Sequence, residues 1–344
     1  MPTIGEWLKQ SAERLKSAGI STARLDCLIL LEDSIGHDRS WLLSHPEHEL
    51  QGSVLKNLNT KIVQRATHVP LAYLRGKAEF YGRDFTVNEH TLVPRPETEA
   101  MINLLKRVRS MEADVAAFQV ERRGRKPIKK QYKFEKQEPP SSLVKTTDGY
   151  QVVWQKPRRT AFTQAPAPIH GQSLRYHDDD FCIVDVGTGS GAIAITAKLE
   201  MPDATVVATD IDEHCLKTAR QNAKTYDVDI SFRRGDLLAA LNESWLPANT
   251  IGVLLCNLPY VPDDFHINTA ATHEPKHAIF GGTDGLDLYR RLFQQIAARQ
   301  PSQQPLYILA EALPPSHKTL ATIAKAAGYT FERTDDFIQL FERA

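Results

Sequence analysis

Residues 181–191 read Phe-Cys-Ile-Val-Asp-Val-Gly-Thr-Gly-Ser-Gly, and this stretch decides the fold. The mostly apolar run Phe181 to Val186 predicts a buried strand, and the apolar residues from Ala192 to Leu199 predict the helix that follows it. Three alternating glycines stand between the two elements, where glycine lets the backbone turn sharply and approach a ligand closely. A strand, a glycine-rich turn and a helix in this order predict the beginning of an α/β sheet.

The same alternation of strand, loop and helix continues through the residues that follow. Apolar or β-prone runs predict six further strands, at 204–209, 230–232, 251–256, 306–311, 329–333 and 337–343. Helical periodicity predicts helices at 212–226, 285–298 and 317–327. We therefore expect an α/β fold with a seven-stranded, mainly parallel, Rossmann-like sheet and helices on both faces, whose last two strands form an antiparallel hairpin at one edge.

The glycine loop predicts a cofactor site. Its spacing is G-x-G-x-G, whereas the dinucleotide fingerprint G-x-G-x-x-G leaves room for a pyrophosphate. The shorter form is typical of sites for S-adenosylmethionine, which has no phosphate. A purely structural tight turn is the alternative, although such a turn rarely needs three glycines. We predict that the loop binds the cofactor through Asp185, Gly187, Thr188, Gly189, Ser190 and Gly191.

Two acidic residues follow the next two predicted strands. Asp210 stands 23 positions after Gly187, close to the usual offset of about 20 residues for an acid that accepts hydrogen bonds from a ribose. Its neighbour Asp212 is the alternative, or else caps the following helix. In our interpretation Asp236 accepts a hydrogen bond from an adenine amino group, and Leu237 packs against the adenine ring. The alternative, that Asp236 only forms a turn, is equally compatible with the sequence.

The tetrapeptide Asn257, Leu258, Pro259, Tyr260 directly follows the fourth predicted strand. Ligands of such sheets bind at the carboxyl ends of the strands, so we expect these residues to face the reactive end of the cofactor. The Asn257 side-chain carbonyl and the Leu258 backbone carbonyl offer two acceptors, Pro259 stiffens the turn and Tyr260 presents a flat ring. This set suits a planar –NH2 group, either a carboxamide or the exocyclic amine of a base, and a turn without function is the alternative.

The residues before the sheet fall into three further segments. Helical periodicity at 7–18, 22–35, 40–43 and 53–66 predicts a small bundle over 1–76. Residues 77–110 predict a β-hairpin that turns at Gly82 and Arg83, then a rigid Val-Pro-Arg-Pro-Glu-Thr-Glu segment at 93–99 and a helix through Val108. We assign 111–180 to a basic, proline-rich insertion and 181–344 to the catalytic domain.

The charges of the chain are unevenly distributed. The 42 Lys and Arg residues balance the 42 Asp and Glu residues, and the 42% hydrophobic content excludes a wholly disordered, collagen-like or coiled-coil chain. Residues 119–160 nevertheless hold twelve basic and four acidic residues, a formal charge of +8, so the rest of the chain carries −8. A solvated loop, or a contact with nucleic acid or the ribosome, both suit this segment. Within it we expect a strand at 149–154 that pairs with 131–134.

Other features narrow the class of protein. Cys27, Cys182, Cys215 and Cys256 lie far apart and form no C-x-x-C pair, which favours buried free thiols in a reducing compartment over disulfides, and we predict no metal site. No apolar run is long enough for a transmembrane helix, and the first residues do not resemble a secretory signal. We expect a cytoplasmic protein that is a monomer.

The chain resembles the HemK/PrmC family of release-factor glutamine methyltransferases. The matching pieces are residues 93–99, 185–191 and 257–260, together with Glu274-Pro275 and residues 281–287, and the resemblance covers about 1–108 and 181–344. The family usually has N-P-P-Y where this chain has Leu258 in the second place; since that position is thought to act through its backbone carbonyl, the change is tolerable. The segment 111–180 is also a departure, because the family links these parts with a much shorter stretch.

The resemblance implies a class I S-adenosylmethionine-dependent methyltransferase with an N-terminal helical bundle and a β-hairpin linker. Its implied activity is methylation of the side-chain nitrogen of the glutamine in the Gly-Gly-Gln motif of class I peptide chain release factors. It further implies that the N-terminal helices dock the release factor. Arg95 and Glu97 then contact the substrate at the border of the cleft, or else form an ion pair that fixes the hairpin, whereas Glu274 and Asp284 shape loops.

The residues themselves leave three alternative functions open. A DNA or RNA methyltransferase that acts on an exocyclic amine would also use residues 257–260 to bind a planar –NH2 group. A nicotinamide dehydrogenase explains the glycine loop but not residues 257–260. A binding module that kept the fold and lost its activity is the third, although none of the predicted chemical residues is missing.

Overall fold

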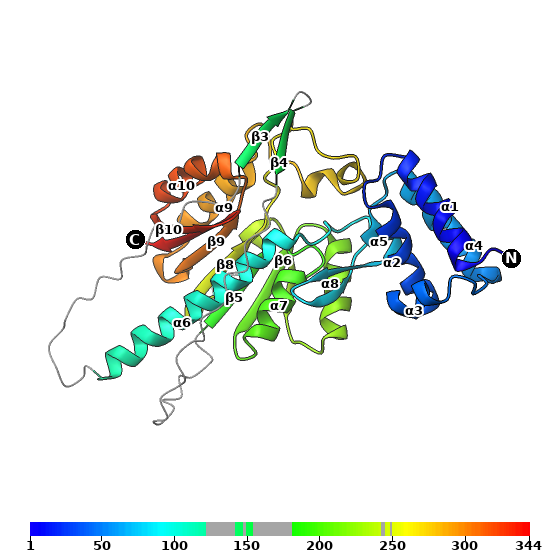
Figure 1. Cartoon of the computed structure of the whole chain (residues 1–344). Coiled ribbons are helices and arrows are strands. Elements are labelled where there is room, and N and C mark those ends of the chain that lie inside the picture. Colours follow the sequence, from blue (N-terminus) through cyan, green and yellow to red (C-terminus); the bar gives the residue numbers. More distant parts are fainter. Residues whose placement is uncertain (122–141, 147–148, 154–180, 242–244, 248–249) are drawn as a thin grey trace. The chain divides into compact units, whose positions relative to one another are not determined.

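The computed structural model describes residues 1–121, 142–146, 149–153, 181–241, 245–247 and 250–344 (Figure 1). Contacts between Cα atoms divide the chain into two compact units, each considered by itself. Unit 1 comprises residues 1–94 and 267–279, and unit 2 comprises residues 95–266 and 280–344. The chain therefore leaves unit 1 at Pro94 and returns to it once. The division into four segments with the bounds given above stays a prediction.

Unit 1 is the helical bundle that periodicity predicts. Its helices are α1 (Ile4–Ser17), α2 (Ala23–Ile35), α3 (Arg39–Ser44), α4 (Gly52–Ala66) and the five-residue α5 (Leu71–Arg75), which the sequence analysis missed because five residues show no period. A capping box between Thr3 and Glu6 begins α1, and Gly36 ends α2 in the left-handed conformation. Their apolar faces share one core, which includes Trp7, Leu15, Cys27, Leu30, Leu31, Leu58 and Ile62.

The predicted hairpin follows in the same unit. Strand β1 (Lys77–Phe80) pairs antiparallel with β2 (Arg83–Thr86), and the turn residues Tyr81 and Gly82 have φ values of 53° and 72°. Positive φ at both positions matches the twist of a two-residue hairpin. The segment 267–279 joins this region because Val93 N donates to Glu274 Oε2 at 3.0 Å. Glu274 thus shapes a loop, as expected.

Unit 2 contains the predicted sheet. Within the described residues, seven strands pair in the order β10-β11-β9-β8-β5-β6-β7. Their bounds are β5 Phe181–Val186, β6 Thr205–Asp210, β7 Ser231–Arg234, β8 Ile251–Cys256, β9 Tyr307–Glu311, β10 Tyr329–Asp335 and β11 Ile338–Arg343. Strands β5 to β9 run parallel, and β11 is antiparallel to both β9 and β10. The Rossmann-like, mainly parallel sheet with its edge hairpin is confirmed.

Helices cover both faces of this sheet (Figure 1). The described helices are α6 (Glu99–Glu121), α7 (Ala192–Glu200), α8 (Glu213–Thr225), α9 (Asp287–Ala297) and α10 (His317–Ala326). Side chains alternate along β5, so Val184 and Val186 pack with α9 and α10, whereas Asp185 faces α7 and binds its Ala194 N. The largest buried side chains on the α9 side include Tyr289, Phe293, Tyr329 and Phe341. Both faces are therefore buried, as parallel strands require.

One expectation near the insertion is wrong. Helix α6 continues thirteen residues beyond Val108, to Glu121, because the sequence between Pro96 and Gly124 has neither proline nor glycine to stop it. Strand β4 (Gly149–Val153) lies where we expect a strand and pairs with β3 (Ser142–Thr146), which the sequence analysis missed. The expected partner at 131–134 lies outside the described residues. Most of the basic residues of 119–160 lie outside the described residues, and so does the predicted nucleic-acid or ribosome contact.

The cysteines agree with the expectation of buried free thiols. All four cysteines are free and buried. Burial raises the pKa of the Cys27 thiol to about 12 and that of Cys182 to about 11, so both thiols stay protonated at neutral pH. In the described part of the chain, every helix is too short or too polar to cross a membrane.

Candidate active site

Strand register brings the four predicted motifs of unit 2 to one edge of the sheet. Val186 at the end of β5 is paired with Thr209 of β6 on one side and with Cys256 of β8 on the other. Asp210 is paired with Arg234, which immediately precedes Gly235 and Asp236. Because parallel strands end at the same edge, the glycine loop lies between Asp210 and Asn257, as the sequence predicts.

The glycine loop is held from below by Asp185. Its Oδ2 accepts hydrogen bonds from Thr188 Oγ1 at 2.6 Å and from Ala194 N at 3.1 Å, while Oδ1 is buried without a partner among the described residues. Burial raises the pKa of the Asp185 carboxyl to about 7. Asp185 therefore ties the loop to the first turn of α7, and its expected contact with the cofactor stays a prediction.

The loop leaves space where a cofactor needs it. Gly187 and Gly189 have φ values of 76° and 56°, and a Cβ atom on Gly189 would meet no other atom within 4 Å. At Gly191, with φ of 82°, a Cβ atom would lie 3.0 Å from the Ala219 side chain of α8. Gly189 thus leaves the turn open, Gly187 permits the close approach of the Leu258 side chain, and Gly191 permits close packing of helices, which together suit a cradle for S-adenosylmethionine.

The three acids differ in what they already bind. Asp210 Oδ2 accepts from Gly189 N and Oδ1 from Asp212 N, both at 2.9 Å, so the carboxylate is fixed beside the loop and remains only half buried. Asp212 caps α8 by accepting from His214 N, which was its alternative role. Asp236 is paired with Arg291 of α9, and Leu237 is buried with φ of 53°. Each Asp210 oxygen thus already accepts one backbone hydrogen bond, and Asp236 shares its charge with Arg291; their contacts with a ribose and an adenine stay predictions.

Asn257 is held by Thr98 from the Pro-Arg-Pro-Glu-Thr segment. Its Nδ2 donates to Thr98 Oγ1 at 3.0 Å, and no described residue donates to its Oδ1. Since Nδ2 is directed to Thr98, Oδ1 is the acceptor that Asn257 has to offer a ligand. Thr98 itself is only 2% exposed.

The tetrapeptide departs from N-P-P-Y at Leu258, and the structure compensates for the change. Leu258 is buried, and its side chain would lie 3.2 Å from a Cβ atom on Gly187. Its N–H donates to the Tyr289 hydroxyl at 3.4 Å, a contact that proline, which lacks an N–H, cannot make. The same hydroxyl lies 2.9 Å from Cys256 O and 2.5 Å from Glu311 O. Tyr289 therefore joins the ends of β8 and β9 beneath the tetrapeptide.

Tyr260 is fixed by a buried carboxylate. Its hydroxyl donates to Glu311 Oε1 at 2.9 Å, and Glu311 is fully buried at the end of β9. Burial, together with the negative charge of Glu311, raises the pKa of the Tyr260 hydroxyl well above its usual value. Tyr260 consequently remains a donor, and the orientation of its ring is fixed by this hydrogen bond.

The glycine-rich segment 281–287 packs against the backbone of the tetrapeptide. A Cβ atom on Gly281 would lie 2.3 Å from Pro259 O, and one on Gly285 would lie 2.1 Å from Tyr260 O. Asp284 pairs with Arg290 and accepts from Leu286 N, which fixes the loop around these glycines and agrees with the expected shaping role. These close contacts fix the position of the tetrapeptide backbone relative to the glycine-rich segment.

Arg95 and Glu97 both act on Glu311. The charge of Glu97 raises the pKa of Glu311, and the charge of Arg95 lowers it. Glu97 Oε2 is buried and has no hydrogen-bond partner in the part of the chain that the structure describes. These residues belong to the surroundings of the tetrapeptide, and their contact with substrate stays a prediction.

The sequence analysis missed Glu311 and Tyr289 as site residues and assigned Thr98 only to the start of a helix. One signal for Glu311 was available: an acid ends the otherwise apolar strand β9. Ala310 is paired with Cys256, so Glu311 leaves β9 beside Asn257. No local pattern distinguishes Tyr289 from an ordinary core residue, since it lies on the buried face of α9 with Leu292, Phe293 and Ile296.

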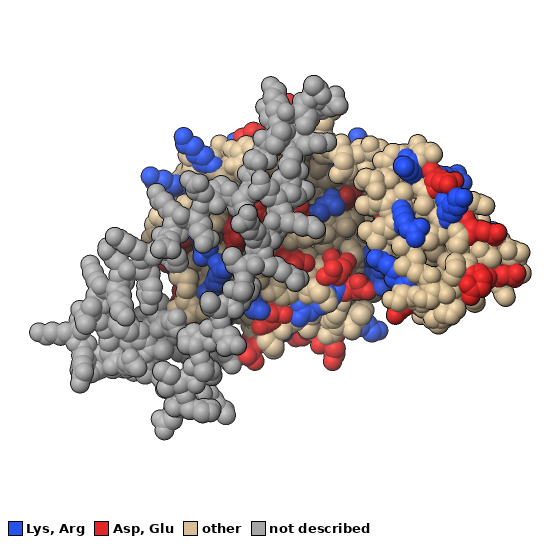
Figure 2. Space-filling model, in the orientation of Figure 1, with Lys and Arg blue, Asp and Glu red and all other residues tan. Residues whose placement is uncertain are grey.

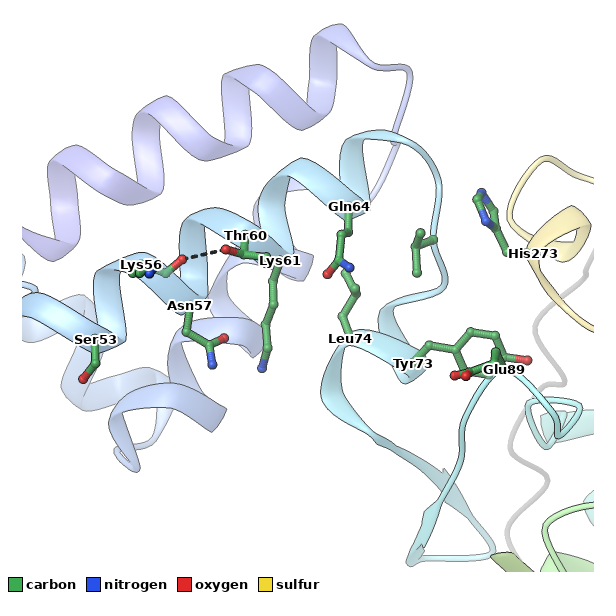
Figure 3. Close-up of a pocket in the computed structure, with 11 residues that line it drawn as sticks. Ser53, Lys56, Asn57, Thr60, Lys61, Gln64, Tyr73, Leu74, Glu89 and His273 are labelled. Atoms are coloured by element: carbon green, nitrogen blue, oxygen red, sulfur yellow. Dashed lines mark hydrogen bonds between the residues drawn. The ribbon is translucent and has the colours of Figure 1, made fainter. Parts of the chain in front are cut away.

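Unit 1 has its own concave surface, a groove of about 640 Å³ (Figure 3). One polar face of α4 forms its wall, and the close-up shows that face opposite Tyr73, Leu74 and Glu89. The α4 residues that line it are Ser53, Lys56, Asn57, Thr60, Lys61 and Gln64. His273 contributes from the returning segment, where its Nε2 lies 2.8 Å from Thr67 O. On the face of unit 1 that Figure 2 presents, basic and acidic side chains are mixed, and the charged residues that line the groove are Lys56, Lys61 and Glu89.

Known proteins resemble this chain in both parts. A PrmC N-terminal domain matches residues 6–76, and a methyltransferase small domain matches residues 173–274. A release factor glutamine methyltransferase of Deinococcus radiodurans is 29% identical over 336 residues, which cover 97% of this chain and 94% of that protein. A bifunctional methyltransferase of Rickettsia bellii is 28% identical over 84% of this chain and 45% of that protein. The chain spans about half of the length of the Rickettsia relatives that it matches.

Among solved structures, a ribosomal protein L11 methylase of Lactobacillus delbrueckii aligns with a TM-score of 0.31 and 16% identity, over 47% of this chain and 70% of that chain. The fold assignment therefore rests on strand order, strand register and the matched methyltransferase domain. The two matched domains have the order that the resemblance predicts. Together with the similarity to release factor glutamine methyltransferases over most of the chain, they make this chain similar to PrmC proteins in its N-terminal part and to methyltransferases in its sheet.

Proposed function

We propose that this protein transfers a methyl group from S-adenosylmethionine to the side-chain nitrogen of the glutamine in the Gly-Gly-Gln motif of a class I peptide chain release factor. One observation carries the proposal: Thr98 holds Asn257 by its Nδ2, which leaves Oδ1 to accept from a ligand beside the Leu258 carbonyl. Two acceptors and the fixed Tyr260 ring suit the two hydrogens and the flat face of a carboxamide. The name of the Deinococcus relative supports the same activity.

The loop residues fit the cofactor. Gly189 leaves the turn open, and the half-buried Asp210 carboxylate lies beside it as a ribose acceptor. When bound, S-adenosylmethionine supplies a methyl group on a sulfonium, which is already a strong electrophile. We propose that Leu237 and Asp236 flank the adenine, with Asp236 also keeping its pair with Arg291.

The chain's own contribution is positioning. An amide nitrogen is a poor nucleophile because its lone pair is delocalised, so it has to be held about 3–3.5 Å from the methyl carbon and in line with the bond that breaks. Such ordering contributes roughly 7–11 kcal/mol to lowering a barrier. Asn257 Oδ1 and Leu258 O accept the two amide hydrogens and favour positive charge on the nitrogen. The proton leaves after the transfer, and no thiol is required: burial raises the pKa of Cys256 beneath the site, which keeps it inert.

We further propose that the release factor docks on the groove of unit 1. The α4 face offers hydrogen-bonding side chains at successive turns, and Lys56 and Lys61 add positive charge. Charges at such a surface mainly set the rate of encounter and the register of the partner. The same partner would place the protein in the cytoplasm, where translation terminates.

Reversal of both groove charges tests the docking surface. In the Lys56→Glu, Lys61→Glu variant we expect the KM for the intact release factor to rise about tenfold at low salt, with kcat and cofactor affinity unchanged. We expect this because two positive charges that attract the release factor become negative charges that repel it. The predicted catalytic residues lie far away in the sequence and are unchanged. Lys9→Glu with Lys16→Glu on the exposed face of α1 is the matched control. An equal rise of KM in both double variants contradicts a specific groove.

A labelling experiment tests the function as a whole. The protein is incubated with methyl-labelled S-adenosylmethionine and with an intact release factor, DNA or RNA in separate reactions. We expect label only on the release factor, and none after its loop glutamine is changed to alanine. Label on an exocyclic amine of nucleic acid would instead establish the alternative acceptor.

A further inference from the structure

Tyr289 is a fully buried tyrosine beneath the tetrapeptide, and the mechanism proposed above gives it no role. It lies on the apolar face of α9, is 0% exposed and belongs to the core of the sheet. Burial raises the pKa of its hydroxyl well above the usual value, so the hydroxyl stays protonated at neutral pH. A buried hydroxyl is costly unless it is hydrogen-bonded, so its partners indicate what it does.

The hydroxyl contacts three backbone groups at two strand ends. It lies 2.5 Å from Glu311 O and 2.9 Å from Cys256 O, and the Leu258 N–H donates to it at 3.4 Å. A phenol has one hydrogen and carbonyls only accept, so the hydroxyl donates towards the carbonyls and accepts from Leu258. The two shorter contacts fix the oxygen in place, which makes it a fixed acceptor for the N–H.

The Leu258 N–H depends on this hydroxyl. Among the described residues, the Tyr289 oxygen is its only hydrogen-bond acceptor. Leu258 is 2% exposed, which leaves little room for water to replace the tyrosine, and a buried N–H without a partner is costly. The separation of 3.4 Å is long for an N–H···O bond, so we assign the contact a directional role rather than a large share of the stability.

Two backbone torsions of Leu258 set the direction of its carbonyl, which is the second acceptor of the proposed mechanism. Pro259 restricts ψ, because a proline excludes the α region for the residue before it. The covalent structure of leucine does not restrict φ as a proline ring would. Contacts supply this restraint instead: Tyr289 holds the N–H on one side of the bond, and packing against Gly187 holds the side chain on the other.

We propose that Tyr289 is a positioning residue for methyl transfer: its hydroxyl holds the Leu258 N–H and thereby directs the Leu258 carbonyl to the acceptor amide. This inference rests on the proposed function. A proline at 258 would restrict φ by its ring and would have no N–H to hold. The Tyr289 hydroxyl and the Leu258 side chain together therefore supply by contact the rigidity that a proline supplies covalently.

Tyr289→Phe is the first test, because it removes only the hydroxyl. We expect kcat for the release factor to fall about tenfold, with the affinity for S-adenosylmethionine within about twofold of the wild type. Tyr329→Phe is the matched control: Tyr329 is a similarly buried tyrosine of the same core, and its hydroxyl donates to Pro305 O at 2.7 Å. Both variants should melt at a lower temperature, but only Tyr289→Phe should lose kcat. Equal kcat in the two variants would overturn the proposal.

Leu258→Pro shows whether the hydroxyl acts through the N–H. It removes the N–H and restricts φ, and we expect it to lower kcat about threefold because the ring lacks the side chain that packs against Gly187. In this background Tyr289→Phe should lower kcat less than about twofold further. It should still lower the melting temperature, because Cys256 O and Glu311 O lose their donor. A further loss of about tenfold in kcat would show that Tyr289 acts only through the strand ends, which contradicts the proposal.

Leu258→Ala separates the N–H from the side chain. It keeps the N–H, so in this background Tyr289→Phe should still lower kcat about tenfold. If the effect of Tyr289→Phe disappeared here as well, the coupling would depend on the leucine side chain and the role of the N–H would be wrong. This pair decides the question even where the proline variant does not fold.

Amide hydrogen exchange in the free protein separates this inference from the proposed function. We expect the Leu258 N–H to exchange at least about tenfold faster in Tyr289→Phe than in the wild type, and within about twofold of the wild-type rate in Tyr329→Phe. Equal rates in the wild type and Tyr289→Phe overturn the proposal even if the release factor is methylated. A wild type whose Leu258 amide is protected by Tyr289 but which methylates no release factor overturns the proposed acceptor and leaves the contact with Tyr289 established.

Discussion

Asn257→Ala is expected to reduce turnover at least about a hundredfold while S-adenosylmethionine still binds. The substitution removes the Asn257 Oδ1 acceptor, which the hydrogen bond from Nδ2 to Thr98 leaves for the amide of the substrate. The amide then lacks one of its two anchors and loses the in-line approach on which the rate depends. Single-turnover methylation of a release factor and cofactor titration by calorimetry measure the two effects separately.

Two further variants sharpen this prediction. Asn257→Asp keeps an acceptor but loses the donor to Thr98, so its turnover should fall between those of wild type and alanine variant. Asn268→Ala removes an amide that accepts from Ala271 N in unit 1, and it should leave turnover unchanged. If Asn257→Ala turned over within threefold of the wild type, the proposed mechanism would be wrong.

Gly285→Ala is expected to have an effect of similar size without touching any predicted ligand. A Cβ atom there would lie 2.1 Å from Tyr260 O, far inside contact distance, and backbone cannot rotate away as a flexible side chain can. The tetrapeptide must shift, and a displacement of about 1 Å costs roughly a hundredfold in rate. Steady-state kcat for the release factor, measured at saturating cofactor, reports the loss.

The matched control for this variant is Gly328→Ala. Gly285 and Gly328 have φ values of 77° and 88°, so alanine meets similar backbone strain at both, about 1–2 kcal/mol. A Cβ atom on Gly328 would have no other atom within 4 Å. Both variants should lose stability in thermal unfolding, but only Gly285→Ala should lose turnover. Equal activity of the two variants would show that the contact with Tyr260 does not matter.

The sequence predicted most of the fold because its signals are local. Apolar runs such as Phe181–Val186 and Ile251–Cys256 match the strands end to end, since a strand buried on both faces is apolar throughout. The errors lie where local signals are weak: α5 is too short to show a period, and β3 is a short strand that the sequence analysis missed. Helix α6 ran on because nothing in its sequence ends it.

The candidate site divides in the same way. The sequence by itself determined that the glycine loop, Asp210 and Asn257 end neighbouring strands, and parallel strands must bring such ends to one edge. Only the tertiary structure decided which side chains orient them. Thr98 stands 159 positions before Asn257, and Glu311 stands 51 positions after Tyr260. Hydrogen bonds between such distant residues depend on atomic positions set by packing of the whole sheet, which no periodicity in the sequence encodes.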